Sequence, residues 1–159
     1  RRVLFRSDHV LHDDSDRLLR RFYCPEPQIQ AGLKLRSIAS ACIDISDGLM
    51  ADLGHICKAS GVTAVIQTER LPIAAEILER SPLDALEWAL CGGDDYQLCF
   101  TVAADQLASV EALIDLGELD ARRIGTINPG DQSSVMVSVI DKNDTLLTVV
   151  KPGYNHFGH

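Results

Sequence analysis

Short apolar runs and helical repeats of apolar residues follow one another along this chain. Residues 39–45 are a small apolar run without a helical period, which predicts a buried strand. From Leu49, apolar residues recur at helical spacing as far as residue 60, and Gly61 then predicts the end of a helix. Residues 62–67 are rich in β-branched residues and predict the next strand. Strand, turn, helix and strand in this order are typical of an α/β layer.

Further elements follow from the same patterns. Helical spacing and helix-start signals predict helices over residues 13–23, 28–38, 71–78, 84–90 and 105–116. Strand patterns occur over residues 96–102, 123–127, 135–140 and 146–150, with Asn143-Asp144 as a hairpin turn. We therefore expect an α/β fold on the border of α+β, in which helices cover a mixed β-sheet in a single layered domain.

The first residues of the chain fit none of these elements. We predict that residues 1–12, which begin Arg-Arg-Val-Leu-Phe-Arg-Ser, are a non-native or disordered start and that residues 13–159 are the domain itself. A chain of 159 residues with 46% hydrophobic residues is long enough to bury a core without a metal ion or disulfides.

The charge of the chain narrows the classes of ligand that it can bind. A formal charge of −8 repels the phosphates of DNA and RNA, so no nucleic-acid partner is expected. A phosphate ligand would have to be held through cations bound by carboxylates. The sequence shows neither a signal peptide nor an apolar run long enough to cross a membrane, so no membrane partner is expected.

The cysteines predict reduced thiols rather than a redox or zinc site. Their number, five, is odd, and no pair has the two-residue gap of a metal or redox motif. Cys42, Cys57 and Cys99 lie in apolar runs, where cysteine acts as a small buried hydrophobic residue. We expect a cytoplasmic protein.

The segment Asp44-Ile45-Ser46-Asp47-Gly48-Leu49 is the first candidate for chemistry. Asp44 ends an apolar strand, where its carboxylate would point into the crevice in which open α/β sheets bind ligands. Asp44 and Asp47 are three residues apart across a turn and could both face one magnesium–phosphate cluster. A structural alternative is open for Asp47, because serine and aspartate before a helix are common N-caps.

Two further segments are candidates with structural alternatives. Gly92-Gly93-Asp94-Asp95-Tyr96 joins a flexible turn to two carboxylates, but a helix stop followed by a solvated acidic turn has the same pattern. If the carboxylates belong to a strand, Asp94 and Asp95 point to opposite faces. The aromatic residues of the tail, residues 152–157, could stack on a flat ligand or dock the terminus onto the body. A Gly-rich phosphate loop with its lysine is absent from the sequence.

Taken together, these residues resemble the thiamine-monophosphate kinases, within the broader family of aminoimidazole-ribonucleotide-synthetase-like ATP-binding enzymes. The resemblance extends from about residue 13 to residue 157. Its most specific pieces are Asp44-Ile-Ser-Asp-Gly-Leu49 with Asp52-Leu53-Gly54-His55-Ile56, then Gly92-Gly93-Asp94-Asp95-Tyr96, then Gly153-Tyr154-Asn155-His156-Phe157. The order and spacing of these pieces carry the resemblance.

The resemblance implies a reaction and a set of site residues. Such kinases move the γ-phosphoryl group of ATP onto thiamine monophosphate, and magnesium ions clamped by aspartates offset the repulsion between the two anions. By resemblance, Asp44 and Asp47 are Mg²⁺ ligands and Ser46 contacts ATP. Asp94 and Tyr154 stand at positions that contact the thiamine substrate.

The chain also departs from these kinases. They usually carry glutamate at the positions of Asp94 and Gln97, and they are about twice as long. Their N-terminal domain, which supplies much of the ATP site and forms a homodimer, has no counterpart here, so we expect negligible kinase activity from the chain alone. Two alternatives stay open: a sister ATP-binding enzyme with another substrate, and a non-catalytic binding module of the same fold.

Overall fold

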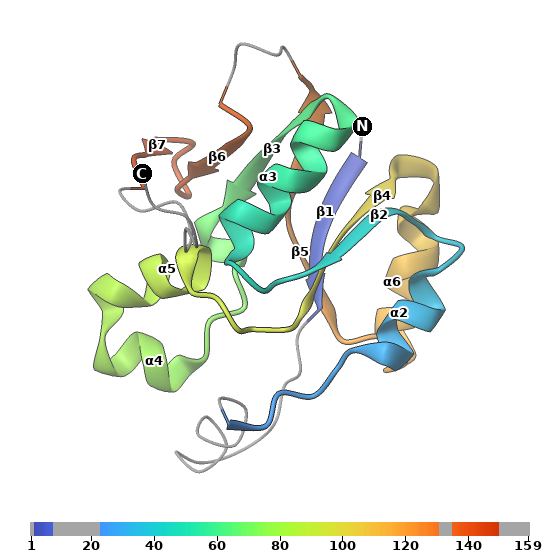
Figure 1. Cartoon of the computed structure of the whole chain (residues 1–159), viewed down its shortest axis with the longest axis horizontal. Helices are drawn as coiled ribbons and strands as arrows, with labels where there is room; N and C mark the ends of the chain where they lie inside the picture. The colour runs from blue at the N-terminus through green and yellow to red at the C-terminus, as the bar shows by residue number, and fades with distance from the viewer. Residues whose placement is uncertain (1, 8–22, 131–134, 150–159) are drawn as a thin grey trace.

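The computed structural model describes residues 2–7, 23–130 and 135–149. Within these residues the strands form one sheet in the order β2-β4-β1-β5-β3-β6-β7 (Figure 1). Their bounds are β1 Arg2–Ser7, β2 Ala39–Asp44, β3 Val62–Gln67, β4 Leu98–Ala103, β5 Ala121–Pro129, β6 Val137–Ile140 and β7 Leu146–Leu147. Strands β3 and β6 are parallel and the other neighbours are antiparallel, so the expected mixed sheet is confirmed.

The helices occur close to where their patterns predict them. They are α2 Ile29–Leu35, α3 Leu49–Ser60, α4 Ala75–Arg80, α5 Pro82–Cys91 and α6 Leu107–Asp115, with short 3₁₀ turns at Thr68–Arg70 and Ala104–Gln106. Gly61 ends α3 in the left-handed conformation at φ 62°, as expected of a C-terminal glycine. The predicted helix over residues 13–23 and the tail containing Tyr154 lie outside the described residues.

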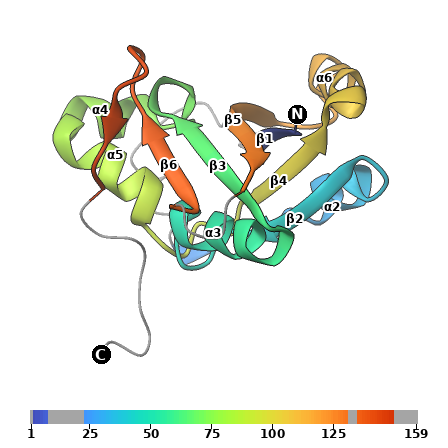
Figure 2. The same cartoon turned by 90° about the horizontal axis from the view of Figure 1, so that it is seen from above.

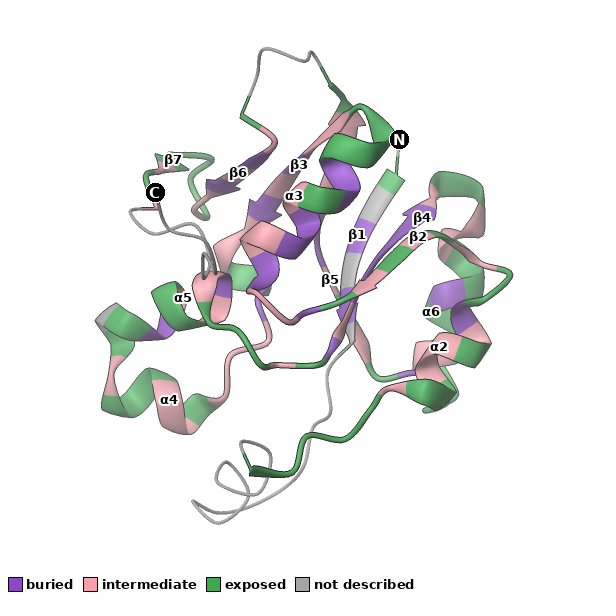
Figure 3. Ribbon diagram, in the orientation of Figure 1, coloured by how far each residue is buried: buried purple, intermediate pink, exposed green. Residues whose placement is uncertain are grey.

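Two hydrophobic clusters flank the sheet. Helices α3 and α5 bury Leu49, Leu53 and Leu90 in one cluster, whereas α2 and α6 bury Leu35 and Val110 in the other. Because successive side chains of a strand point to opposite faces, β4 contributes Cys99 to the first cluster and Phe100 to the second. Figure 2 shows α3 and α6 on opposite sides of the sheet, and Figure 3 shows buried residues where these helices face the strands. The layered arrangement is therefore as predicted.

The structure differs from the expectation for the start of the chain. Residues 2–7 are not disordered but form β1, which pairs with β4 on one side and with β5 on the other. Leu4 is fully buried in the larger cluster. An alternation of apolar and charged residues, Leu4 next to Arg6, is the signal that points to a strand here. The non-native origin of these residues stays a prediction, and residues 8–12 lie outside the described part.

Strand β2 also differs from its prediction as a buried strand. It lies at the edge of the sheet next to β4, and its residues alternate between half-buried and exposed. Cys42 and Asp44 are consequently exposed. The buried cysteines are Cys57 and Cys99, for which burial raises the pKa to about 11 and about 12. In the described part of the chain, no helix has both the length and the apolar character needed to cross a membrane.

Substitution of Phe100 tests the second hydrophobic cluster. Phe100 lies on β4 and is fully buried in the cluster that this strand forms with α2 and α6. Phe100→Ala should therefore lower the free energy of unfolding by about 3–5 kcal/mol, measured by urea denaturation. Leu116→Ala is the control, because Leu116 is 72% exposed and its loss should change stability by less than about 0.5 kcal/mol. Equal losses for the two variants would contradict this assignment of the core.

Candidate functional site

The loop between β2 and α3 and the loop between α5 and β4 lie against each other. The N–H of Ile45 donates to the carbonyl of Gln97 at 2.8 Å, and the N–H of Tyr96 donates to the carbonyl of Ile45 at 2.8 Å. The N–H of Asp94 donates to the carbonyl of Ser46 at 2.9 Å. These bonds continue the antiparallel pairing of β2 with β4 beyond the strands. The two acidic motifs of the sequence are therefore parts of one site.

Two glycines permit this close approach. A Cβ atom on Gly93 would lie 2.6 Å from the carbonyl oxygen of Ser46, closer than carbon and oxygen atoms can pack. A Cβ atom on Gly48 would lie 2.9 Å from the carbonyl of Cys91, and Gly48 also has a φ of +110°, which other residues rarely adopt. Each glycine therefore admits the backbone of the opposite loop.

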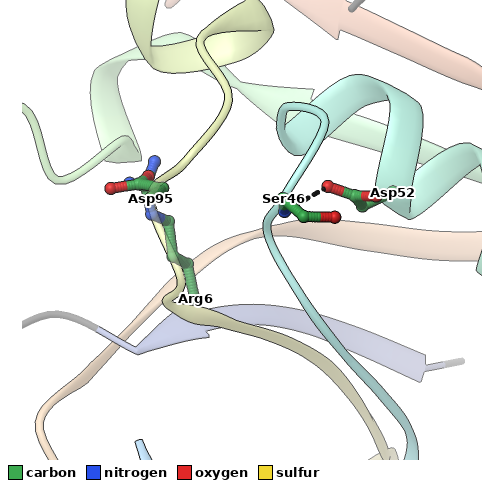
Figure 4. Close-up of polar contacts among 4 residues, drawn as sticks. All are labelled: Arg6, Ser46, Asp52 and Asp95. Carbon is green, nitrogen blue, oxygen red and sulfur yellow. Dashed lines mark hydrogen bonds and ion pairs between the residues drawn. The ribbon is translucent and has the colours of Figure 1, made fainter. Parts of the chain in front are cut away.

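Asp52, in the first turn of α3, holds the first loop from inside the protein. One of its carboxylate oxygens accepts the N–H of Ser46 at 2.9 Å and the N–H of Asp47 at 3.0 Å (Figure 4). Asp52 is only 2% exposed, and these charge-assisted bonds compensate for burying its carboxylate. The N-cap position of α3 falls on Gly48, so Asp47 lies one residue before it and is not the cap.

Asp52 also belongs to a group of possible metal ligands with Asp47 and His55. One ligand atom from each of the three residues lies within 4.8 Å of the others. Two carboxylates suit the preference of Mg²⁺ for oxygen ligands, whereas imidazole is a less usual ligand for this ion. Asp44, the other predicted metal ligand, is not a member of this group. Asp52 and His55 were not predicted as site residues, although their spacing of three residues places them on one face of a helix.

The two aspartates of the second loop have different partners. Asp95 forms an ion pair with the buried guanidinium of Arg6 on β1, toward which it points in Figure 4. Asp94 accepts a hydrogen bond from the phenol of Tyr96 at 2.9 Å. Asp94 and Tyr96 adopt left-handed backbone conformations, with φ 62° and φ 50°. β4 begins only at Leu98, so strand alternation does not set these directions.

The hydrogen bond between Tyr96 and Asp94 changes the acidity of the phenol. The carboxylate of Asp94 accepts the phenolic hydrogen and its negative charge disfavours a second anion nearby, so the pKa of Tyr96 is raised above its ordinary value. Tyr96 therefore stays neutral and keeps its hydrogen bond well into the alkaline range. The strained backbone of these two residues is typical of segments that hold a ligand-binding side chain in place.

A hollow of ≈ 320 Å³ opens beside the paired loops. Asp44 and Tyr96 lie in its wall, and the complete lining is Pro25, Pro27, Gln28, Asp44, Tyr96 and Leu98. Among the residues predicted from the sequence, the structure thus brings Asp44, Ser46, Asp47 and Asp94 to one end of the sheet. The remaining predicted residue, Tyr154, is outside the described part of the chain.

Residues 5–138 match the family of AIR synthase related proteins, C-terminal domain. This range includes strands β2 to β5, the first two residues of β6 and both loops of the site. The match also includes residues 5–7, which belong to β1.

Three comparisons with individual proteins agree with this match. The chain is 36% identical to the thiamine-monophosphate kinase of Buchnera aphidicola subsp. Schizaphis graminum, over 88% of this chain and 42% of that protein. The crystal structure of thiamine-monophosphate kinase from Stenotrophomonas maltophilia K279a superposes with a TM-score of 0.76, at 36% identity, over 87% of this chain and 49% of that one. The structure named AaThiL complexed with AMPPCP and TMP gives a TM-score of 0.75 at 27% identity, over 98% of this chain and 51% of that one. The chain spans about half the length of the proteins it matches.

Adding one methyl group tests whether the two loops depend on their close contact. Gly93→Ala should destabilise the protein by about 1–3 kcal/mol, because its Cβ atom would collide with the carbonyl of Ser46. Gly54→Ala is the matched control: Gly54 lies inside α3 with open space around its missing Cβ atom, so alanine should stabilise the helix by about 0.5–1 kcal/mol. Thermal unfolding measures both changes, and a neutral Gly93→Ala would contradict the close contact.

The phenol of Tyr96 should titrate later than an ordinary tyrosine. A pKa raised in the folded state stabilises the protein below the unfolded value of 10.0, and this contribution is lost as the pH rises through the folded pKa. Ultraviolet titration at alkaline pH should show a late-ionising tyrosine that Tyr96→Phe removes and that Asp94→Asn returns toward the ordinary value. A late phase unchanged in both variants would mean that another group is responsible.

Proposed function

Because this chain belongs to the family of AIR synthase related proteins, C-terminal domain, we propose that it is the C-terminal part of a thiamine-monophosphate kinase. The complete enzyme transfers the γ-phosphoryl group of ATP to thiamine monophosphate and releases thiamine diphosphate and ADP. Relatives with this name support the proposal, as does a neighbouring structure described as a complex with AMPPCP and TMP.

One observation carries the proposal: backbone pairing joins the two acidic loops at one end of the sheet. Asp44 ends β2, Asp47 follows three residues later, and Asp94 lies on the paired loop. A chain with a net charge of −8 that concentrates carboxylates at one end does not attract bare phosphates. Such a site suits substrates that arrive with magnesium, as ATP does.

Asp44 and Asp47 are the residues that would hold Mg²⁺. The donor set agrees with this role, since Asp47 stands close to the carboxylate of Asp52 and to His55, and Asp44 is exposed at the end of its strand. Bound magnesium supplies positive charge that offsets the repulsion between the phosphates of the two substrates. Asp52 orients Asp47 by accepting its backbone N–H.

Ser46 is proposed to contact ATP, and its backbone hydrogen bonds support this role. Its N–H donates to Asp52 and its carbonyl accepts the N–H of Asp94, so the backbone is fixed from both sides. The residue has little freedom to lose when it binds a nucleotide, and such preorganisation strengthens binding. Asp94 is proposed to contact the thiamine substrate, and its aspartate is one methylene shorter than the glutamate usual at this position.

The other parts of the enzyme belong to the longer protein. We propose that an additional N-terminal domain completes the ATP site and forms a homodimer, that Tyr154 in the tail contacts the thiamine substrate, and that the enzyme is cytoplasmic. The chain of 159 residues should by itself show negligible turnover. Appreciable thiamine diphosphate formation by this chain alone would contradict the proposal that the N-terminal domain is needed for activity.

The decisive test uses the longer protein that includes these residues. Formation of thiamine diphosphate from thiamine monophosphate, ATP and Mg²⁺ should occur, and Asp44→Asn should reduce kcat by about 100-fold or more, because one charge of the metal site is lost. Asp115→Asn is the control, since Asp115 is exposed at the end of α6 and should leave kcat unchanged.

The other outcomes separate the alternatives. A folded protein that binds nucleotide with magnesium but makes no thiamine diphosphate would be a sister enzyme with another acceptor. A folded protein that binds no nucleotide would be a non-catalytic module of this fold.

A further inference from the structure

Asp52 contacts three consecutive residues of the loop that precedes α3. Its carboxylate oxygen Oδ2 accepts the N–H of Ser46 at 2.9 Å and the N–H of Asp47 at 3.0 Å (Figure 4). Its own N–H donates to the carbonyl of Gly48 at 3.0 Å, and this bond is the first of the helix. One helical residue therefore fixes the last three residues before α3.

The same geometry makes Asp52 a poor metal ligand. A carboxylate oxygen offers about two lone-pair positions, and two N–H donors already occupy those of Oδ2. Asp52 is also buried, so an incoming cation reaches it less easily than it reaches the half-buried Asp47 or the exposed His55. Although the three residues place ligand atoms within 4.8 Å of one another, the bonds of Asp52 suit holding the loop rather than holding an ion.

One peptide group extends this hold to the second loop. The peptide between Ser46 and Asp47 donates its N–H to Asp52, and its carbonyl accepts the N–H of Asp94 at 2.9 Å. A donor bonded to a carboxylate polarises its peptide group and strengthens the bond that the carbonyl accepts. Gly93 allows this approach, since a Cβ atom there would lie 2.6 Å from the same carbonyl oxygen. The buried carboxylate and the second loop are thus joined through a single peptide.

We propose that Asp52 is a positioning residue, which touches neither metal nor substrate. Its carboxylate sets the positions of Ser46 and Asp47 and, through the shared peptide group, that of Asp94. The inference rests on the proposed function, in which Asp47 holds Mg²⁺ and Ser46 contacts ATP. A loop that is ordered before binding loses less freedom when the ligand arrives. Groups that orient metal ligands typically contribute about 10–100-fold to metal affinity or activity.

Two substitutions of nearly the same shape separate the acceptor role of Asp52 from its charge. Asp52→Leu removes both acceptors, whereas Asp52→Asn keeps an amide oxygen that can accept the two N–H groups. Calorimetry on the longer protein measures the dissociation constant of AMPPCP in the presence of magnesium. Asp52→Leu should weaken binding by about 10–100-fold. Asp52→Asn should weaken it by less than about tenfold, because bonds to a neutral acceptor are weaker but are still made.

Amide hydrogen exchange in the chain of 159 residues measures the positioning without any ligand. The amides of Ser46 and Asp47 should exchange slowly, should stay protected to within about tenfold in Asp52→Asn, and should exchange at least about 100-fold faster in Asp52→Leu. Protection of the Phe100 amide on β4 verifies that each variant is folded. Asp115→Asn is the control, since Asp115 is exposed on α6 and should change neither exchange nor affinity.

Equal loss of affinity in Asp52→Asn and Asp52→Leu would overturn the inference, because the charge of Asp52, as in a metal ligand, would then be what matters. Unchanged affinity or unchanged exchange in Asp52→Leu would also overturn it. Absence of magnesium-dependent AMPPCP binding by the unsubstituted longer protein would overturn both the inference and the proposed function.

The two proposals can also fail separately. If the variants bind AMPPCP in the expected order but the longer protein makes no thiamine diphosphate, the inference stands and the proposed function fails. If the longer protein makes thiamine diphosphate and Asp52→Leu binds AMPPCP as tightly as the unsubstituted protein, the proposed function stands and the inference fails.

Discussion

The site depends on the backbone hydrogen bonds by which β2 and β4 remain paired beyond their ends. Ile45 exchanges bonds with Tyr96 and Gln97, and Ser46 accepts a bond from Asp94. Without these bonds the two acidic loops would be separate surface segments about fifty residues apart in the chain. Backbone bonds of this kind fix the positions of the loops without using any side chain.

Buried charged side chains hold the two paired loops in place. Asp52 accepts two backbone N–H groups from beneath the first loop, and the buried Arg6 is paired with Asp95 of the second. Each loop is therefore anchored by one aspartate: the first by Asp52 of α3, the second by its own Asp95. These partners help to explain how a strongly acidic chain can gather carboxylates at one end of its sheet.

The sequence was most informative where a local pattern decides the structure. The helix ended by Gly61, the strand over residues 62–67 and the acidic turn after Ser46 all depend on neighbouring residues, and the structure has them as predicted. It was least informative where distant segments decide. The apolar run over residues 39–45 does not reveal that β2 lies at the edge of the sheet, because the burial of a strand depends on which strands flank it.

Two further features were not visible in the sequence because they depend on distant segments or on the path of a loop. Residues 2–7 were assigned to the start of the chain outside the fold, and only their pairing with β4 and β5 makes them a strand. The anchoring role of Asp52 depends on the path of the preceding loop, which folds back over the first turn of α3. Residue spacing places Asp52 on a helix face but does not reveal which backbone groups lie above it.

The pairing of the two loops links ligand binding to folding. The site exists only when segments around residues 45 and 95 have met, and this meeting closes a loop that contains α3, β3 and two further helices. A chain in which that intervening part is unfolded has no site at all. Any ligand of the paired loops therefore binds only the folded domain, and by mass action it must raise the melting temperature as its concentration rises. The thermal stability of this domain is thus coupled to the supply of its ligand.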